Sequence, residues 1–281
     1  MRIIRRSFAV ALAMAILASG LTIPVRPSAG YALSDRRVAN NVLGNTLWTL
    51  THWLSHAVIE ARKRPVDGDV ETAADQLATL LLLEVRNRGP EGASSRAIDT
   101  MLGRTANVMS WVTVAKRAPS EELMPWGGHR ASLARFREVV CIAYGGNPVF
   151  FGKLLQMAYW PEPFQDRARD CLDAYGRTRG AWGDVMTAMA NPETKPSPAR
   201  AIIVRFNPAA AKELDALRAL VADSGVVDDL AEYIGAAGIL GSEALIEFNE
   251  CGGPDSGWDP GSRRVTICYE LLATFPEWTY E

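Results

Sequence analysis

The sequence of 281 residues predicts an α+β protein that is mainly helical, with a small β-sheet contributed by its C-terminal segment. Three observations lead to this fold class. Apolar residues recur at three- and four-residue spacing through residues 43–58, which is typical of one face of a helix. Residues 70–85 are apolar on nearly every side, which is typical of a helix inside a core. Beyond residue 200, short runs rich in β-branched and aromatic residues are typical of strands.

The first helix is expected to begin near Asn40 or Asn41 and to end at residues 62–65, where three cations precede a proline. Cations suit the C-terminal end of the helix dipole, and proline stops propagation. The Asp-Gly-Asp sequence that follows can form a turn and cap a second helix, expected from Val70 to Val85.

The middle of the chain alternates helical patterns with glycine- and proline-containing breaks. Helices are expected at 129–143, 148–158, 165–175 and 180–190, and loops at 89–95 and 125–128.

Residues 192–198 contain proline, lysine and serine and form the clearest linker in the chain. A strand is expected next, at 201–206. Asn207 can then cap a helix that opens with Pro208 and runs to Val221.

Two further strands are expected at 244–248 and 265–269, joined by a long turn rich in glycine and proline. We therefore divide the chain into a signal segment (1–32), a helical region (33–192) and an α+β segment (199–281) of the same domain. The sequence leaves open whether that last segment folds separately.

The first 32 residues have the pattern of a secretory signal peptide. Arg2, Arg5 and Arg6 form a positive region, and residues 7–21 form an uncharged apolar run. Residues 30–32, Gly-Tyr-Ala, provide the small side chains that signal peptidase requires at its cleavage site. The run is shorter than the ~20 apolar residues that a spanning helix needs. We expect export to the periplasm or the medium, with no stable membrane insertion after cleavage. An uncleaved N-terminal anchor is the alternative.

Removal of this segment takes away four arginines and no acids, which leaves 26 basic and 32 acidic side chains and a net charge of −6. A negative chain of this kind is not expected to bind nucleic acid or an anionic membrane surface.

The chain has four cysteines, Cys141, Cys171, Cys251 and Cys268. An even number in an exported protein predicts two disulfides, and four cysteines permit three pairings. Local pairing, Cys141 with Cys171 and Cys251 with Cys268, is the simplest, and a reduced, buried pair is the alternative. A zinc–cysteine cluster is disfavoured because no C-x-x-C spacing is present.

Residues 51–56, THWLSH, contain two histidines four positions apart on the first predicted helix. On an α-helix such residues lie ~40° apart around the axis and ~6 Å along it. His52 and His56 can therefore bind one zinc ion, as in the H-E-x-x-H motif of metallopeptidases. The glutamate of that motif, the general base, is replaced here by Trp53, whose indole N–H is a donor and cannot accept a proton.

The second predicted helix offers a third ligand. Glu71 and Asp75 lie four positions apart, and Glu71 follows His56 by fifteen residues, enough for a turn and an antiparallel return. In zinc sites of this pattern the glutamate binds the metal, and the aspartate orients a ligand histidine. The alternative for the histidines is a hydrogen-bonded pair without metal.

Two other residues are candidates for lesser roles. Glu60 lies on the same side of the helix as the histidines, but two turns from His52, and is expected to be solvated or to support a ligand. His129 lies in a glycine-containing loop and could stabilise an oxyanion, or could be an ordinary surface histidine.

The residues around these positions resemble a bacterial family of putative metallopeptidases, catalogued as domain of unknown function 4344. The segments that carry the resemblance are 43–47 (LGNTL), 52–60, 65–68 (PVDG), 71–78 (ETAADQLA), 135–148, 167–171, 251–260 and 267–271. Members read approximately H-E-x-G-H and E-D-A-A-D-Q at the two helices. The resemblance implies a zincin-like fold, an exported location and a metal held by His52, His56 and Glu71.

The departures from the family pattern gather near the expected metal site. Trp53 replaces the catalytic glutamate, Ser55 replaces a glycine, and Val70 and Thr72 replace acids. Residues 255–257, Asp-Ser-Gly, replace Asn-Ala-Phe. These changes indicate relaxed catalytic constraint on a retained scaffold.

Three hypotheses follow. The first is an exported zincin-like protein that is catalytically impaired by Trp53, still binds zinc and acts by binding a peptide or protein. The second is an active zinc peptidase that uses a different base. The third is a metal-free structural or binding protein.

Overall fold

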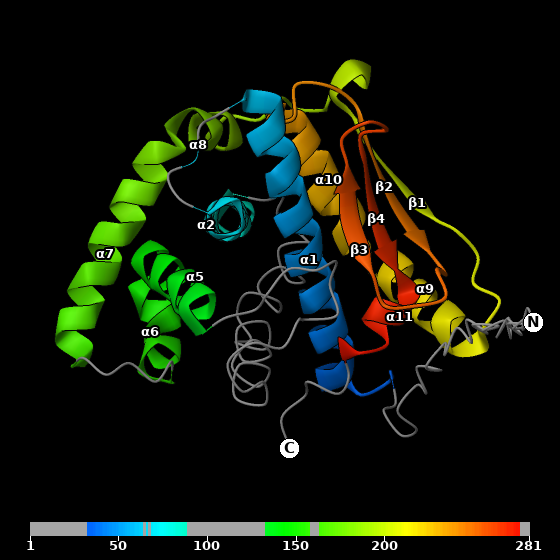
Figure 1. Cartoon of the computed structure of the whole chain (residues 1–281), viewed down its shortest axis with the longest axis horizontal. Helices are drawn as coiled ribbons and strands as arrows, with labels where there is room; N and C mark the ends of the chain where they lie inside the picture. The colour runs from blue at the N-terminus through cyan, green and yellow to red at the C-terminus, as the bar shows by residue number, and fades with distance from the viewer. Residues whose placement is uncertain (1–32, 64–65, 67–68, 89–132, 158–162, 276–281) are drawn as a thin grey trace, which may run out of the picture.

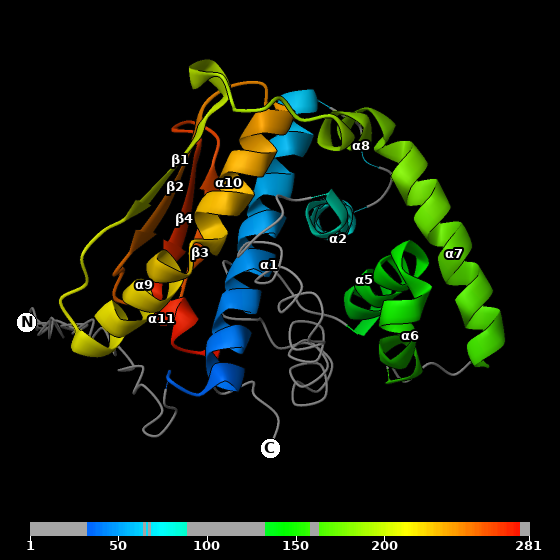
Figure 2. The ribbon, with the colours of Figure 1, turned by 180° about the vertical axis from the view of Figure 1, so that it is seen from behind.

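The computed structural model describes residues 33–63, 66, 69–88, 133–157 and 163–275. Helix α1 (Arg36–Arg62) runs through the middle of the molecule, as Figure 1 shows. Helices α2 and α5 to α8 lie on one side of it, and a four-stranded sheet with α9, α10 and α11 lies on the other (Figure 2). The predicted fold class, α+β and mainly helical, is confirmed.

Helices α1 and α2 (Val70–Arg88) form the centre of the helical side. The carbonyl of Asp35 accepts the first helical bond, so α1 begins one turn before the predicted Asn40. The Asp69 carboxylate accepts bonds from the backbone N–H groups of Glu71 and Thr72, as an N-cap does. The leucines of α2 are almost fully buried, which confirms its predicted place in the core.

The other four helices on this side are α5 (Leu133–Gly146), α6 (Pro148–Met157), α7 (Phe164–Ala181) and α8 (Gly183–Ala190). They lie close to the predicted positions. The disulfide Cys141–Cys171 joins α5 to α7. A Cβ atom on Gly145 would collide with Tyr175 and with the carbonyl of Cys171, so only glycine permits this close approach. None of the helices in the described ranges is long and apolar enough to cross a membrane.

After a short 3₁₀ turn (Pro198–Arg200), the C-terminal segment forms a mixed sheet. Its strands are β1 (Ile202–Phe206), β2 (Ala244–Asn249), β3 (Ser256–Asp259) and β4 (Arg264–Cys268), in the order β1-β2-β4-β3. Strands β1, β2 and β4 are parallel, and β3 pairs antiparallel with β4 at the edge. The helices on this side are α9 (Lys212–Ser224), α10 (Val226–Ala237) and α11 (Tyr269–Leu272).

One face of the sheet belongs to the core. Phe206, Phe248 and Ile267 are register partners on that face, and Ser256 continues the row on β3. Because side chains alternate along a strand, Trp258 faces the same way as Ser256. Strand β3 contacts α1, so this face looks toward the first helix.

Two sequence predictions for this segment are wrong, and one helix is missing from them. Asn207 does not cap a helix: its amide donates to Glu247 and Asn249, and α9 begins only at Lys212. The predicted long turn contains strand β3. Helix α10 was not predicted, although it lies between Gly225 and Gly238, both with positive φ. The division into regions 33–192 and 199–281 of one domain stays a prediction.

Candidate metal centre

Helix α2 is seen end-on in Figure 1 while α1 runs lengthwise, so α2 crosses α1 and does not return antiparallel to it as the sequence predicts. The first turns of α2 therefore meet the polar residues in the middle of α1. His52 and His56 come from the middle of α1, and Glu71 and Asp75 from the start of α2. The exposed fraction is 7% for His52 and 0% for Asp75, while His56 and Glu71 are partly exposed. The group therefore has a buried end at Asp75 and an open end at His56 and Glu71.

Three side chains converge within bonding range of a single point. The Nε2 atoms of His52 and His56 lie 3.2 Å apart. His52 Nε2 lies 3.4 Å from Oε2 of Glu71, and His56 Nε2 lies 3.3 Å from Oε1. A tetrahedral ion with bonds of about 2.0–2.1 Å holds its ligand atoms about 3.3–3.4 Å apart. The spacing of the three side chains thus fits such an ion, and two imidazoles with one carboxylate are a donor set that zinc accepts.

Asp75 fixes the orientation of the first histidine. Nδ1 of His52 lies 2.9 Å from Oδ1 of Asp75. With Nδ1 held by this carboxylate, Nε2 is the ring nitrogen that faces Glu71 and His56, the atom with which His52 could bind a metal. The structure thus has the contact that the predicted role of Asp75 requires, and the role itself stays a prediction.

Arg135, from α5, holds Asp75 from the other side. Its Nε donates to Oδ2 of Asp75 at 2.6 Å, and one of its terminal nitrogens donates to Oδ1 at 2.9 Å. The same terminal nitrogen lies 3.6 Å from Oε2 of Glu71. One buried guanidinium therefore reaches both acids of α2.

The titration of these groups follows from burial and from their contacts. Burial alone lowers the pKa of His52, but its bonds with Asp75 and Glu71 outweigh burial and raise the pKa above 6.5. Burial alone raises the pKa of Asp75, but His52 and Arg135 outweigh it and hold the pKa below its usual value. Burial likewise opposes the charge of Arg135, while Asp75 raises its pKa.

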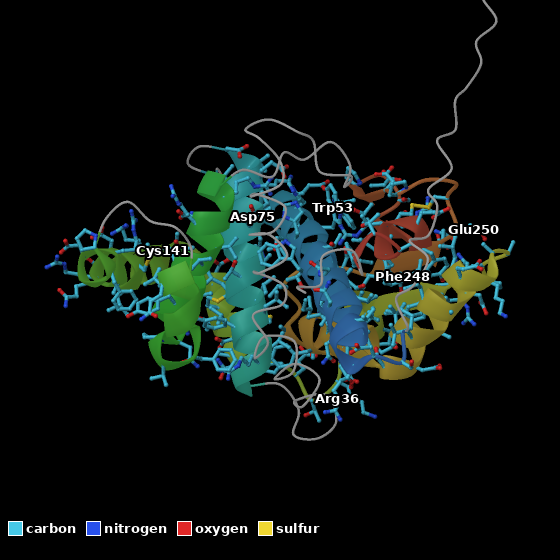
Figure 3. All side chains as sticks on the ribbon, turned by 90° about the horizontal axis from the view of Figure 1, so that it is seen from below. Arg36, Trp53, Asp75, Cys141, Phe248 and Glu250 are labelled. Atoms are coloured by element: carbon cyan, nitrogen blue, oxygen red, sulfur yellow. A yellow bond between two sulfur atoms is a disulfide. The ribbon has the colours of Figure 1, made fainter. Side chains whose placement is uncertain are left out.

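Trp53 lies next to this group, between α2 and the sheet, and Figure 3 shows it between Asp75 and Phe248. Its ring centroid is 5.3 Å from the ring of His52 and 5.3 Å from that of His56. Its indole N–H donates to Oγ of Ser256 at 2.9 Å, and its exposed fraction is only 7%. Where the H-E-x-x-H pattern has a carboxylate, this chain has a buried aromatic ring tied to strand β3.

A second bond crosses the same interface. The indole N–H of Trp258 donates to Oε2 of Glu60 at 2.7 Å. Glu60 thus supports the contact between α1 and β3, and it does not reach the histidines. His129, the candidate oxyanion stabiliser, lies outside the described residues.

A second group of potential ligands among the described residues, Cys251, Cys268 and Glu270, is not a metal site because the two cysteines form a disulfide. The Glu270 carboxylate accepts bonds from the backbone N–H groups of Cys251 and Gly252. Both predicted cysteine pairings, Cys141–Cys171 and Cys251–Cys268, are confirmed.

Two residues of the site were not assigned a role from the sequence. Arg135 lies 60 residues beyond Asp75, and no short motif links them. Ser256 lies 203 residues beyond Trp53, in a segment expected to be a turn. The departures from the family pattern at residues 53 and 255–257 were the available signal for the second pair.

A comparison with known protein families identifies the family of this chain. Residues 27–186, more than half of the chain, match the family described as "putative metallopeptidase", domain of unknown function 4344, and the chain belongs to this family. The chain matches none of the curated proteins and none of the solved structures with which it was compared.

Proposed function

We propose that this member of the metallopeptidase family is an exported zinc-binding protein that has lost most or all peptidase activity and acts by binding a peptide or protein. One observation carries the proposal: the ring of Trp53 lies beside both histidines, at the position where the H-E-x-x-H motif has its general base. Trp53 has no acceptor for a proton from water, and its N–H is already bonded to Ser256.

The zinc ligands in this proposal are His52, His56 and Glu71, with Asp75 holding His52. Support comes from the 3.2–3.4 Å spacing of their donor atoms and from the orientation of Nε2. A zinc ion held there would supply a Lewis acid able to polarise a carbonyl oxygen.

The missing step is proton transfer. General acid–base assistance contributes about 10²–10⁴-fold to a reaction rate. Glu60, the one acidic residue of α1, accepts the bond from Trp258 on strand β3. The described residues thus offer no carboxylate in the place of the lost glutamate, and the proposal assigns the protein a binding role.

Export is part of the proposal. It is supported by the signal-like sequence of residues 1–32 and by two disulfides, which persist in oxidising compartments. The negative net charge of the remaining chain favours a peptide or protein as ligand over nucleic acid.

Metal analysis and peptide hydrolysis test the proposal on the purified protein. We expect one zinc ion per chain, lost in His52→Ala, and hydrolysis equal to that of a chelator-treated blank. Absence of zinc, with no change in melting temperature when zinc is added, would contradict the metal site. Hydrolysis that chelators abolish and His52→Ala removes would contradict the loss of activity.

Trp53→Glu restores an acceptor at the critical position. On an otherwise competent scaffold we expect hydrolysis to rise by about 10²-fold or more. Trp53→Phe is the matched control, since it also removes the bond to Ser256 but adds no acceptor. An equal gain in both variants would show that steric relief, and not the base, was limiting.

A further inference from the structure

Among the described residues, Arg135 supplies a permanent positive charge beside the two acids of the candidate metal centre. Its side chain is 10% exposed, and it comes from α5, whereas the metal ligands come from α1 and α2. It makes two bonds to Asp75, at 2.6 and 2.9 Å, and approaches Glu71 at 3.6 Å. One guanidinium thus partly neutralises two carboxylates that lie one helical turn apart.

The oxygen of Glu71 that faces Arg135 is also the oxygen that faces His52. Oε2 lies 3.6 Å from the guanidinium and 3.4 Å from Nε2 of His52. A metal ion between the histidines and Glu71 would therefore share this carboxylate with Arg135. Two positive groups that share one carboxylate repel each other, and burial strengthens the repulsion.

Arg135 also acts on the metal site through Asp75. A carboxylate that accepts the Nδ1 proton of a histidine makes Nε2 a stronger ligand. The two bonds from Arg135 draw charge away from that carboxylate and so weaken this effect. Both routes, through Glu71 and through Asp75, act in the same direction.

We propose that Arg135 is a positioning residue that keeps the ligands assembled without metal and, in return, limits the affinity of the site for zinc. This inference rests on the zinc site proposed above. The guanidinium of Arg135 and a zinc ion can each neutralise part of the charge of Glu71 and Asp75. Because the guanidinium remains when zinc leaves, zinc exchanges without unfolding of α1 and α2. The site is then suited to reversible binding of zinc.

The test uses the purified protein, expressed from the full chain, with Arg135→Met, Arg135→Lys and a matched control. Arg218→Met is the control, because Arg218 donates to Asp215 over the same 2.6 Å, but with side chains 29% and 45% exposed. Zinc affinity is measured by competition with a chelating dye, and melting temperature with excess chelator and with excess zinc.

We expect Arg135→Met to bind zinc at least tenfold more tightly than the wild type and to melt lower in chelator. Its melting temperature should approach that of the wild type when zinc is in excess. Arg135→Lys keeps the charge without the two-pronged bond, so its zinc affinity should stay within about threefold of the wild type. Arg218→Met should change neither quantity.

Unchanged or weaker zinc binding by Arg135→Met would overturn the inference, as would an equal loss of melting temperature with and without zinc. If Arg135→Met does not fold in chelator, folding on addition of zinc supports the inference, and failure to fold with zinc overturns it. Absence of zinc binding by the wild type would instead overturn the proposed function, so the two failures are distinguishable.

Discussion

Two clusters of acids and arginines, one in the helical half and one on the sheet, show opposite balances of charge. In the metal centre, Glu71 and Asp75 face Arg135. On the sheet, Glu247 lies between Arg205 and Arg264, at 3.1 and 3.0 Å. Among the described residues, the first cluster has more acids than arginines and the second has more arginines than acids.

Burial separates the two clusters further. The side chain of Asp75 is 1% exposed, and that of Arg135 is 10% exposed. The side chain of Glu247 is 11% exposed, but its partners Arg205 and Arg264 are 56% and 40% exposed. The comparison teaches that an ion pair alone does not mark a site. An excess of acidic side chains over arginines beside two histidines is a stronger sign of a metal site, because the remaining negative charge favours binding of a further cation.

Asp75→Asn should have the largest effect. It removes the carboxylate that makes both close bonds to the buried guanidinium of Arg135 and leaves only Glu71, at 3.6 Å. Breaking a buried pair in this way costs about 3–5 kcal/mol. It also loosens His52, so zinc affinity should fall about 10–100-fold. Denaturant unfolding in chelator and dye competition measure the two effects. A loss of less than about 1 kcal/mol would show that the two clusters are energetically alike.

His52→Ala should abolish stabilisation by zinc. With zinc at about 100 times its dissociation constant, the wild type should gain about 2.7 kcal/mol, and the variant should gain almost nothing. Calorimetry at matched zinc concentrations measures the difference. Zinc-dependent stabilisation that survives in the variant would place the metal elsewhere.

Ser256→Ala tests the bond that joins the two halves at Trp53. It leaves a buried indole N–H without its acceptor, which costs about 1–2 kcal/mol. Zinc affinity should stay unchanged. Ser256→Thr keeps the hydroxyl and is the matched control. Equal destabilisation by both variants would point to packing at β3 and not to the hydrogen bond.

Glu247→Gln should have the smallest effect, below about 1 kcal/mol, because its arginine partners reach water. Burial alone raises the pKa of Glu247, but bonds from Asn207, Arg205 and Arg264 outweigh it and hold the pKa below 4.5. The ionised form therefore stabilises the fold above that pH, and the stabilisation is lost as the pH falls through the lowered pKa. Unfolding of both proteins between neutral pH and pH 3 should show the difference shrinking. Any change in zinc affinity would contradict the separation of the clusters.

The helical half could be predicted well because its signals are local. The apolar spacing of α1, the cations at its end and the cap at Asp69 each act within a few residues. His52, His56 and Glu71 lie on two helices that are consecutive in the chain, so their convergence could be inferred without a tertiary structure. The disulfide pairings followed from proximity along the chain in the same way.

The errors occurred where distant segments compete for the same groups. Asn207 is a good capping residue by type, but Glu247 and Asn249 on the adjacent strand take its amide. The start of α9 is instead served by the carboxylate of Glu250, which accepts from the N–H groups of Ala210 and Ala211. Strand β3 is short and rich in turn residues, and only pairing with β4 makes it a strand.

The sequence by itself determined the helix pair and a candidate set of metal ligands and favoured the local disulfide pairing, because each depends on spacing within one element or between neighbours. The tertiary structure alone decided what surrounds those ligands. It placed Arg135 behind Asp75 and tied Trp53 to Ser256, across 60 and 203 residues of sequence. The charge and the chemistry of a buried site depend on whichever side chains pack against it, and packing between distant elements leaves no periodic trace in the chain.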